Sequence, residues 1–373
     1  PADSPGGKEP YLRIAARSFD PSPVEILIDY VRFSRWKHWN EDFRAYYDEE
    51  EELWYNDPPL TLAAAHKVTY KGEPWKDIEP YSPYGYYDSL DTGVMLSQLQ
   101  LMEKAGIDVV LFMHPPSPDV IRKGMKLIRE NGLDLLVSWY WTGDDEQQLI
   151  GEMKSLGDDP LWAKADGRPV VVVGPTGLRE LPYAMYGRKL GNIRDAGIFA
   201  VGDGYSPPKE EMLELLDGHY YYDTTGLYRA GWGGTGIDVA KPDGTFFRGQ
   251  GHLSTFFDAI SRLTHAHGDV HLATVIPGFD NLSVHGFEGS PLYDGRPGTV
   301  VKRHEGATYD ETWQAAIDAR ADWVCIVSWN ELHEGTEIEP TKEHGVKYIE
   351  MTGEWAEKFR KAARREGGGE MEN

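Results

Sequence analysis

Two glutamates near the carboxyl end of the chain, Glu331 and Glu334, have the type and spacing that acid–base chemistry requires. They lie three positions apart in a segment that runs from Ser328 to Pro340 and begins at the end of an apolar run. Paired carboxylates at the end of a strand are the usual apparatus for cleaving a glycosidic bond, because one donates a proton while the other stays ionised. A solvated acidic loop is the alternative interpretation of the same spacing.

Other polar and aromatic residues lie where the sequence predicts the ends of strands. The candidate substrate ligands among them are Tyr30, His114, Trp139, Tyr140, Tyr222, Asp223 and Asp280. Trp139 and Tyr140 are able to stack on a sugar face, with core packing as the alternative. Asp223, like Asp203, is able either to bond a hydroxyl or to cap the helix that follows.

Helical patterns and apolar runs alternate from about residue 93 onward, and runs such as Val109–Met113 are apolar on both faces, as buried parallel strands are. Strands are expected at 25–31, 109–113, 133–141, 170–173, 198–201, 219–222, 270–276 and 323–329. Thr92 is the expected cap of the first helix, which ends before Gly106. Further helices are expected at 118–130, 144–156, 178–195, 209–216, 253–266, 309–319 and 346–364.

This alternation predicts an α/β fold, a single (β/α)8 TIM barrel with long loops at its carboxyl-terminal face. Residues 1–373 are expected to form one catalytic domain, with 1–20 as an extended amino-terminal segment and 366–373 as a disordered tail. Long connections at 32–91 and 224–250 follow predicted strands, so both are expected at the face where barrel active sites form.

The composition limits the partners of the chain. Its 61 Asp and Glu residues exceed its 38 Lys and Arg residues, and this net charge of −23 argues against nucleic acid. No stretch of about 18 uncharged apolar residues is present, so we expect no membrane span. The single cysteine, Cys325, is expected to be a buried apolar residue. No His, Asp and Glu set has zinc-type spacing, so neither a metal nor another cofactor is expected.

The segment from Trp329 to Pro340 resembles the signature of glycoside hydrolase family 99, the endo-α-mannosidases and their relatives. In that family the segment reads Trp-Asn-Glu-Trp-His-Glu-Gly-Thr-Gln-Ile-Glu, whereas here Leu332 replaces the second Trp and Glu337 replaces Gln. Supporting similarities occur at 36–40, 84–91, 99–108 and 277–280, so the resemblance covers most of the chain in order.

The resemblance implies a retaining, endo-acting glycoside hydrolase whose substrate is an α-linked, mannan-like oligosaccharide or polysaccharide. Glu331 would act as a base towards the sugar 2-hydroxyl, which would attack the anomeric carbon and form a 1,2-anhydro sugar. Glu334 would protonate the leaving oxygen and later activate water. Trp329, Asn330 and His333 would contact the substrate, with His333 orienting a carboxylate or bonding a hydroxyl.

Three predicted strand ends, at 29–33, 113–116 and 138–141, depart from the family pattern. Because strand ends build the sugar subsites, the catalytic pair is expected to be retained while the sugar and linkage stay open. A non-catalytic carbohydrate-binding barrel and a glycan-processing protein of polysaccharide assembly are the alternative functions. A secreted or periplasmic location is expected if a signal peptide was removed before Pro1.

Overall fold

The computed structural model describes residues 11–13, 26–32, 54–55, 65–66, 69–70, 73–74, 90–113, 118–141, 145–174, 183–203, 213–222, 224–225, 253–280 and 300–367. The predicted ligands His114 and Asp223 lie outside these ranges, as do most of the two long connections. Of the helix expected at 209–216, only residues 213–216 are described, and they lead through a turn into the next strand.

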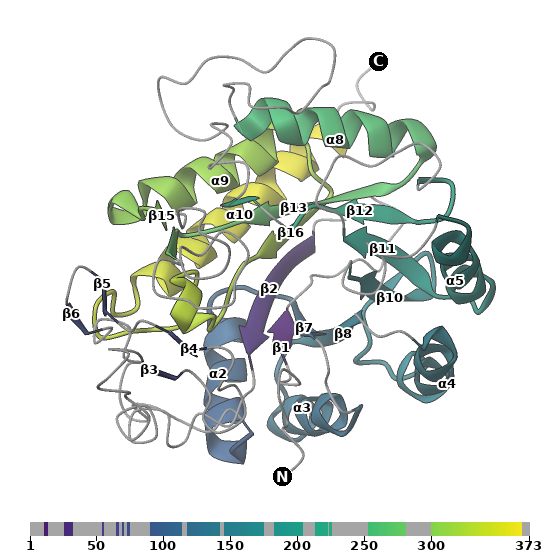
Figure 1. The fold of residues 1–373 in the computed structure, drawn as a ribbon, viewed down its shortest axis with the longest axis horizontal. Coiled ribbons are helices and arrows are strands. Elements are labelled where there is room, and N and C mark those ends of the chain that lie inside the picture. Colours follow the sequence, from purple (N-terminus) through teal and green to yellow (C-terminus); the bar gives the residue numbers. More distant parts are fainter. Residues whose placement is uncertain are drawn as a thin grey trace.

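Eight parallel strands form the centre of the fold (Figure 1). Their bounds are β2 Ile26–Arg32, β7 Val109–Met113, β8 Leu136–Trp141, β10 Arg168–Val173, β11 Phe199–Asp203, β12 Gly218–Tyr220, β13 Val270–Val275 and β16 Trp323–Ile326. Each pairs in parallel with the next along the chain, and β16 pairs in parallel with β2. The predicted α/β class with a parallel sheet is therefore confirmed, and the order of its pairings is cyclic.

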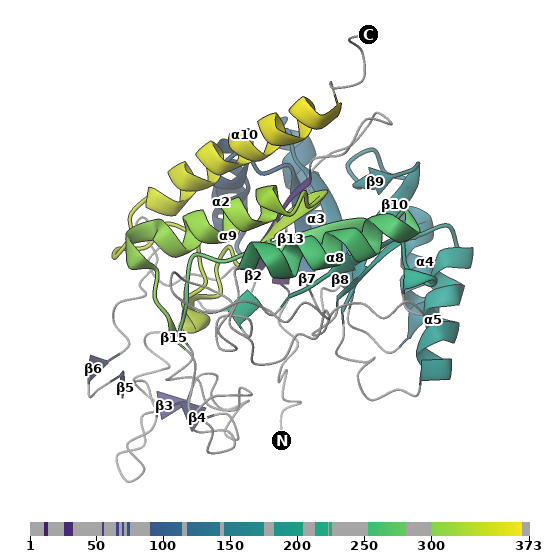
Figure 2. The same ribbon diagram turned by 90° about the horizontal axis from the view of Figure 1, so that it is seen from above.

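Seven helices within the described residues surround these strands (Figures 1 and 2). They are α2 Thr92–Lys104, α3 Pro118–Asn131, α4 Glu146–Leu156, α5 Tyr183–Asp195, α8 Leu253–His267, α9 Ala307–Asp318 and α10 Lys347–Gly367. The expected cap of α2 is wrong by one residue, because Asp91 and not Thr92 accepts the first free backbone N–H groups, those of Gly93 and Val94. Among the described helices, none has the length and apolar character of a membrane span.

Short strands that the sequence does not predict join the main sheet or form separate two-stranded sheets. β1 Tyr11–Arg13 lies antiparallel to both β2 and β7 at their carboxyl ends, so it widens the sheet where those two strands separate. β9 Lys164–Ala165 forms a hairpin with β10, and β14 Phe279–Asp280 pairs with β15 Val300–Val301. The remaining short strands are β3 Trp54–Tyr55, β4 Ala65–His66, β5 Thr69–Tyr70 and β6 Glu73–Pro74.

Side chains fill the space that the eight strands enclose. Tyr140 on β8 meets Tyr220 on β12 edge to face, with ring centroids 6.4 Å apart, and the Tyr220 hydroxyl lies 3.1 Å from Cys325 Sγ on β16. These strands are not neighbours in the sheet, so the contacts cross the interior. The rings of Trp323 on β16 and Phe199 on β11 also meet, at a tilt of 37° with centroids 5.7 Å apart. Cys325 is buried as predicted, and a substrate site must lie at an end of this packed interior.

The outer face of the sheet packs against the helices. Phe112 on β7 faces Gly124 on α3 so closely that a Cβ on the glycine would lie 2.5 Å from the Phe112 ring. Trp139 pairs in register with Phe112 and is 5% exposed, so it lies on the same outer face. Since successive side chains of a strand alternate between faces, Tyr140 points inward while Trp139 points toward the helices. The position of Trp139 favours core packing and does not fit the predicted stacking on a sugar.

Candidate active site

The candidate site is built on the loop that follows β16, here called the carboxylate loop, residues 328–339. Its two limbs are joined by backbone hydrogen bonds: Ser328 N donates to Thr336 O at 2.7 Å, and Glu339 N donates to Trp329 O at 2.8 Å. Ile338 N donates to the carbonyls of both Ser328 and Trp329, at 2.8 and 3.1 Å. The loop is therefore a closed hairpin-like structure anchored at the carboxyl end of β16.

A tight turn at the tip of the carboxylate loop carries both candidate carboxylates. Residues Leu332–Glu334 form the 3₁₀ helix η4, in which Glu334 N donates to Glu331 O at 3.2 Å. Thr336 N also donates to Glu331 O, at 3.4 Å, so the carbonyl of Glu331 accepts two of the hydrogen bonds that close the turn. Gly335 ends η4 in the left-handed region at φ 62°, where a residue without a Cβ avoids strain.

The burial of the two glutamates decides whether this acidic segment is an active site or a solvated loop. Glu331 is 3% exposed and Glu334 is 4% exposed, and Asn330 beside them is 4% exposed. A solvated acidic loop would expose its carboxylates, because removing a charge from water has a large cost unless it is compensated. The observed burial therefore contradicts the solvated-loop interpretation. It agrees with the interpretation of Glu331 and Glu334 as active-site carboxylates.

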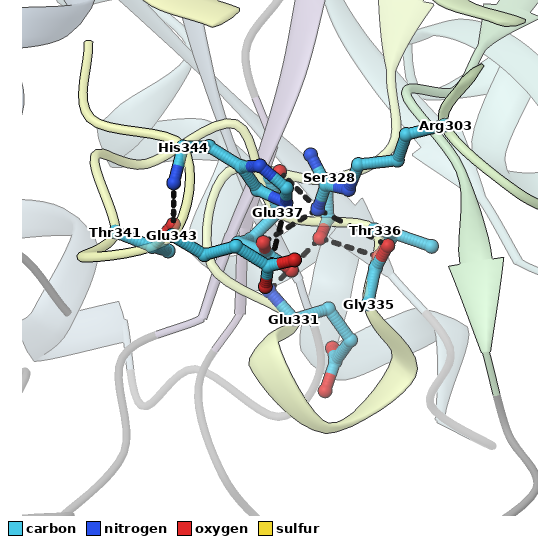
Figure 3. Close-up of polar contacts among 9 residues, drawn as sticks. All are labelled: Arg303, Ser328, Glu331, Gly335, Thr336, Glu337, Thr341, Glu343 and His344. Carbon is cyan, nitrogen blue, oxygen red and sulfur yellow. Dashed lines mark hydrogen bonds and ion pairs between the residues drawn. The ribbon is translucent and has the colours of Figure 1, made fainter. Parts of the chain in front are cut away.

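Ser328 links both limbs through its side chain. Its Oγ accepts a hydrogen bond from Glu331 N at 2.9 Å and lies 2.8 Å from Thr336 Oγ1 (Figure 3). Ser328 is completely buried, so these contacts are shielded from competing water. The backbone that carries Glu331 is thus fixed by a short polar side chain on the opposite limb.

A buried ion pair holds the return limb of the carboxylate loop. Arg303 Nη2 lies 2.5 Å from Glu337 Oε1, and the two side chains are 13% and 3% exposed. Burial raises the pKa of Glu337 to about 7, while the neighbouring Arg303 charge acts in the opposite direction. Figure 3 shows this pair on one side of the loop and the Glu331 side chain directed away from it. The pair therefore supports the loop without occupying the position of the candidate base.

A second buried contact ties the carboxylate loop to helix α2. Gln98 Nε2 donates to Glu339 Oε1 at 3.1 Å, and Gln98 is 2% exposed. Glu339 ends the return limb, so the loop is fixed at β16, at Arg303 and at α2. Neither Gln98 nor Arg303 is among the site residues predicted from the sequence, because a buried contact across many positions leaves no periodic signal in the sequence.

The other predicted ligands differ in where the structure places them. Asp280 lies against the carboxylate loop, since a Cβ on Gly335 would be 3.4 Å from Asp280 N. Trp329 is completely buried, and its indole Nε1 has no hydrogen-bond partner among the described residues. Tyr140 lies deeper, and Tyr222 contacts Tyr220 with ring centroids 6.4 Å apart.

Tyr30 and His333 are described only in their backbones. Tyr30 pairs with Leu111 of β7 and with Arg13 of β1, so it lies near the carboxyl end of β2. His333 lies within η4, between the two candidate carboxylates. Within the described part of the chain, no group of three or more His, Cys, Asp or Glu side chains is arranged to hold a metal ion.

Part of this chain is similar in sequence to a known protein family. Residues 243–361 match the family model described as "Glycosyl hydrolase family 99", a range that includes Asp280, Arg303 and the whole carboxylate loop. A search of curated proteins found no match.

Solved structures show the same fold. A GH99 endo-α-mannosidase from Bacteroides thetaiotaomicron is similar with a TM-score of 0.56 and 20% sequence identity, covering 76% of this chain and 84% of that one. A structure of the same kind of enzyme in complex with bis-tris-propane gives a TM-score of 0.57 at 20% identity, covering 76% of this chain and 90% of that one. Residues 243–361, which include the whole carboxylate loop, are therefore similar to glycosyl hydrolase family 99, and the chain shares the fold of these solved enzymes.

Proposed function

We propose that this protein is a glycoside hydrolase, a retaining, endo-acting enzyme that cleaves α-mannosidic linkages. The observation that carries the proposal is the burial of Glu331 and Glu334 on one tight turn at the end of β16. The solved relatives of the same fold are endo-α-mannosidases, which supports the substrate class. We also infer that the eight strands form one complete (β/α)8 barrel, in a single domain, with this loop at its carboxyl-terminal face.

In the proposed first step, Glu331 removes the proton of the sugar 2-hydroxyl, whose oxygen then attacks the anomeric carbon. The bond from this carbon to the glycosidic oxygen breaks, and Glu334 gives that oxygen a proton. The products are a shortened glycan and a 1,2-anhydro sugar at the end of the other fragment. Neither carboxylate forms a covalent bond in this route, because both transfer only protons.

In the second step, Glu334 takes a proton from water, and the water oxygen attacks the anomeric carbon of the 1,2-anhydro sugar. The carbon–oxygen bond of the three-membered ring breaks, and Glu331 returns its proton to the 2-oxygen. Two inversions at one carbon give overall retention. A rigid turn favours this exchange of roles, since catalytic groups held in fixed geometry reduce the barrier to each transfer.

The experiment is a substrate panel of α-mannan, α-glucan and acidic glycans with product analysis. We expect cleavage of α-mannan to a ladder of oligosaccharides, and NMR of the earliest products is expected to show the α-anomer. Binding of a glycan without any cleavage would overturn the proposal in favour of a carbohydrate-binding barrel. A requirement for a nucleotide sugar would overturn it in favour of a polysaccharide-assembly role.

A further inference from the structure

Arg303 approaches the carboxylate loop from outside it, just after β15, and reaches three oxygens of the return limb. Its Nη2 atom donates to Gly335 O at 3.2 Å, to Glu337 O at 2.9 Å and to Glu337 Oε1 at 2.5 Å. Two of these acceptors are backbone carbonyls, so Arg303 restrains the path of the chain as well as one side chain.

The guanidinium itself is held in place by its surroundings. Its Cζ lies 4.6 Å from the centre of the Tyr348 ring on α10, a cation–π distance. On another side, Gly278 leaves room for the stem, because a Cβ there would lie 2.6 Å from Arg303 Cγ and 2.9 Å from Val301 O. Since Arg303 is nearly buried and contacts α10 and the segment after β13, it connects the loop to rigid parts of the fold.

The return limb in turn fixes the turn that carries the candidate carboxylates. Gly335, whose carbonyl Arg303 bonds, directly follows Glu334 and closes η4 through its own N–H to Leu332 O at 3.2 Å. Thr336 bonds Glu331 O and Ser328. A movement of the 335–337 backbone would therefore move Glu334 and Glu331 together.

We propose that Arg303 is a positioning residue for the hydrolytic reaction, which fixes the 335–337 backbone and through it the geometry of Glu331 and Glu334. This inference rests on the proposed function, because positioning affects the rate only if those two carboxylates react. Small displacements of catalytic groups have large kinetic effects, so loss of the restraint reduces kcat more than it reduces binding.

The test compares Arg303→Met, which keeps the stem and removes the donors, with Arg360→Met. Arg360 is a matched control because its Nη2 likewise bonds one carbonyl and one carboxylate, Gly106 O at 2.6 Å and Asp108 Oδ2 at 2.5 Å, next to the amino end of β7. On the glycan that the wild type cleaves, we expect Arg303→Met to lower kcat by about 10- to 100-fold with KM changed by no more than about twofold. We expect Arg303→Lys to restore part of the rate and Arg360→Met to keep it. A folded Arg303→Met enzyme with kcat within about twofold of the wild type would overturn the proposal.

Two further measurements keep the proposal testable on its own. Gly278→Ala removes no polar group and displaces the Arg303 stem, so it is expected to reproduce the kcat effect in weaker form if Arg303→Met does not fold. Hydrogen exchange of the amides at 334–336 is expected to accelerate in Arg303→Met and not in Arg360→Met. If the wild type cleaves no α-glycan, the proposed function fails while exchange still tests the restraint, and unchanged exchange would refute it.

Discussion

Ser328 Oγ and Thr336 Oγ1 lie 2.8 Å apart, and this contact joins the two limbs of the carboxylate loop inside the protein. The same Ser328 oxygen accepts the hydrogen bond of Glu331 N. One hydroxyl therefore adds a side-chain link between the two limbs and restrains the backbone that carries Glu331.

We predict that Ser328→Ala lowers the free energy of unfolding by about 1–3 kcal/mol, because it leaves the Glu331 N–H buried without its acceptor. Urea unfolding measures this change, and kcat is expected to fall with it. Ser155→Ala is the control, since Ser155 Oγ bonds Glu152 O at an exposed position and its removal is expected to have little effect. Equal stability of the two variants would show that the Ser328 contacts carry no net energy.

Neutralising either candidate carboxylate is predicted to stop the reaction and leave the fold intact. Glu331→Gln and Glu334→Gln keep the shape of the side chain and remove its ability to transfer a proton, so kcat is expected to fall by about 10²- to 10⁴-fold. Circular dichroism and thermal unfolding check the fold. Glu354→Gln, at an exposed position on α10, serves as the control. A Glu334→Gln enzyme that turns over at nearly the wild-type rate would remove Glu334 from the mechanism.

Glu337 gives a prediction for the pH dependence of stability. Burial raises its pKa from 4.5 to about 7, with Arg303 opposing and Glu343 reinforcing the shift. The folded state therefore binds the proton more tightly than the unfolded state, and this group lowers stability as pH rises from about 4.5 to about 7. Glu337→Gln mimics the protonated form, so we expect its Tm to exceed that of the wild type at pH 8 and to match it near pH 4.5.

Differential scanning calorimetry across that pH range measures the effect, with Glu354→Gln as a control that shows no pH-dependent difference. If Glu337→Gln instead lowers Tm at pH 8, attraction to Arg303 outweighs the desolvation of the carboxylate.

Gly335 and Gly345 have the same left-handed backbone conformation but different surroundings, so their alanine variants can be compared. Gly335 and Gly345 have φ values of 62° and 56°, but a Cβ on Gly345 meets no atom within 4 Å, whereas a Cβ on Gly335 lies 3.4 Å from Asp280 N. Gly335→Ala and Gly345→Ala are each predicted to cost about 1–2 kcal/mol of stability from the left-handed conformation. Only Gly335→Ala is expected to reduce kcat, because Gly335 ends η4 directly after Glu334, whereas Gly345 lies outside the carboxylate loop. Equal activity of the two variants would show that backbone strain at Gly335 does not reach the candidate carboxylates.

The sequence predicts the strands well because their residues are apolar on both faces. The run Val109–Met113 coincides with β7, and the run beginning at Val270 differs from β13 by one residue at its end. Because both faces of these strands are apolar, the sequence does not indicate which side chains point into the interior. Trp139 and Tyr140 are adjacent and both aromatic, and only the contacts of Tyr140 with Tyr220 and the register of Trp139 with Phe112 distinguish them.

The supports of the site are less accessible to sequence analysis. The segment from Ser328 to Pro340 stands out through its composition, which is why Glu331 and Glu334 can be named from sequence alone. Arg303 comes from an irregular segment after β15, and nothing in its neighbours indicates that it is nearly buried against Glu337. Long-range ion pairs depend on how elements meet in space, and a single sequence does not contain that information.

The pairing of β16 with β2 has a consequence for the timing of activity. It joins Trp323 in register with Ile26, so strands from opposite ends of the described chain must meet before the cycle of pairings is complete. Contacts between distant segments form slowly, and synthesis delivers the last strand late. Because the carboxylate loop directly follows that strand, a nascent chain on the ribosome has no assembled carboxylate pair. The candidate carboxylates therefore take up their positions only after β16 has been synthesised and has paired with β2.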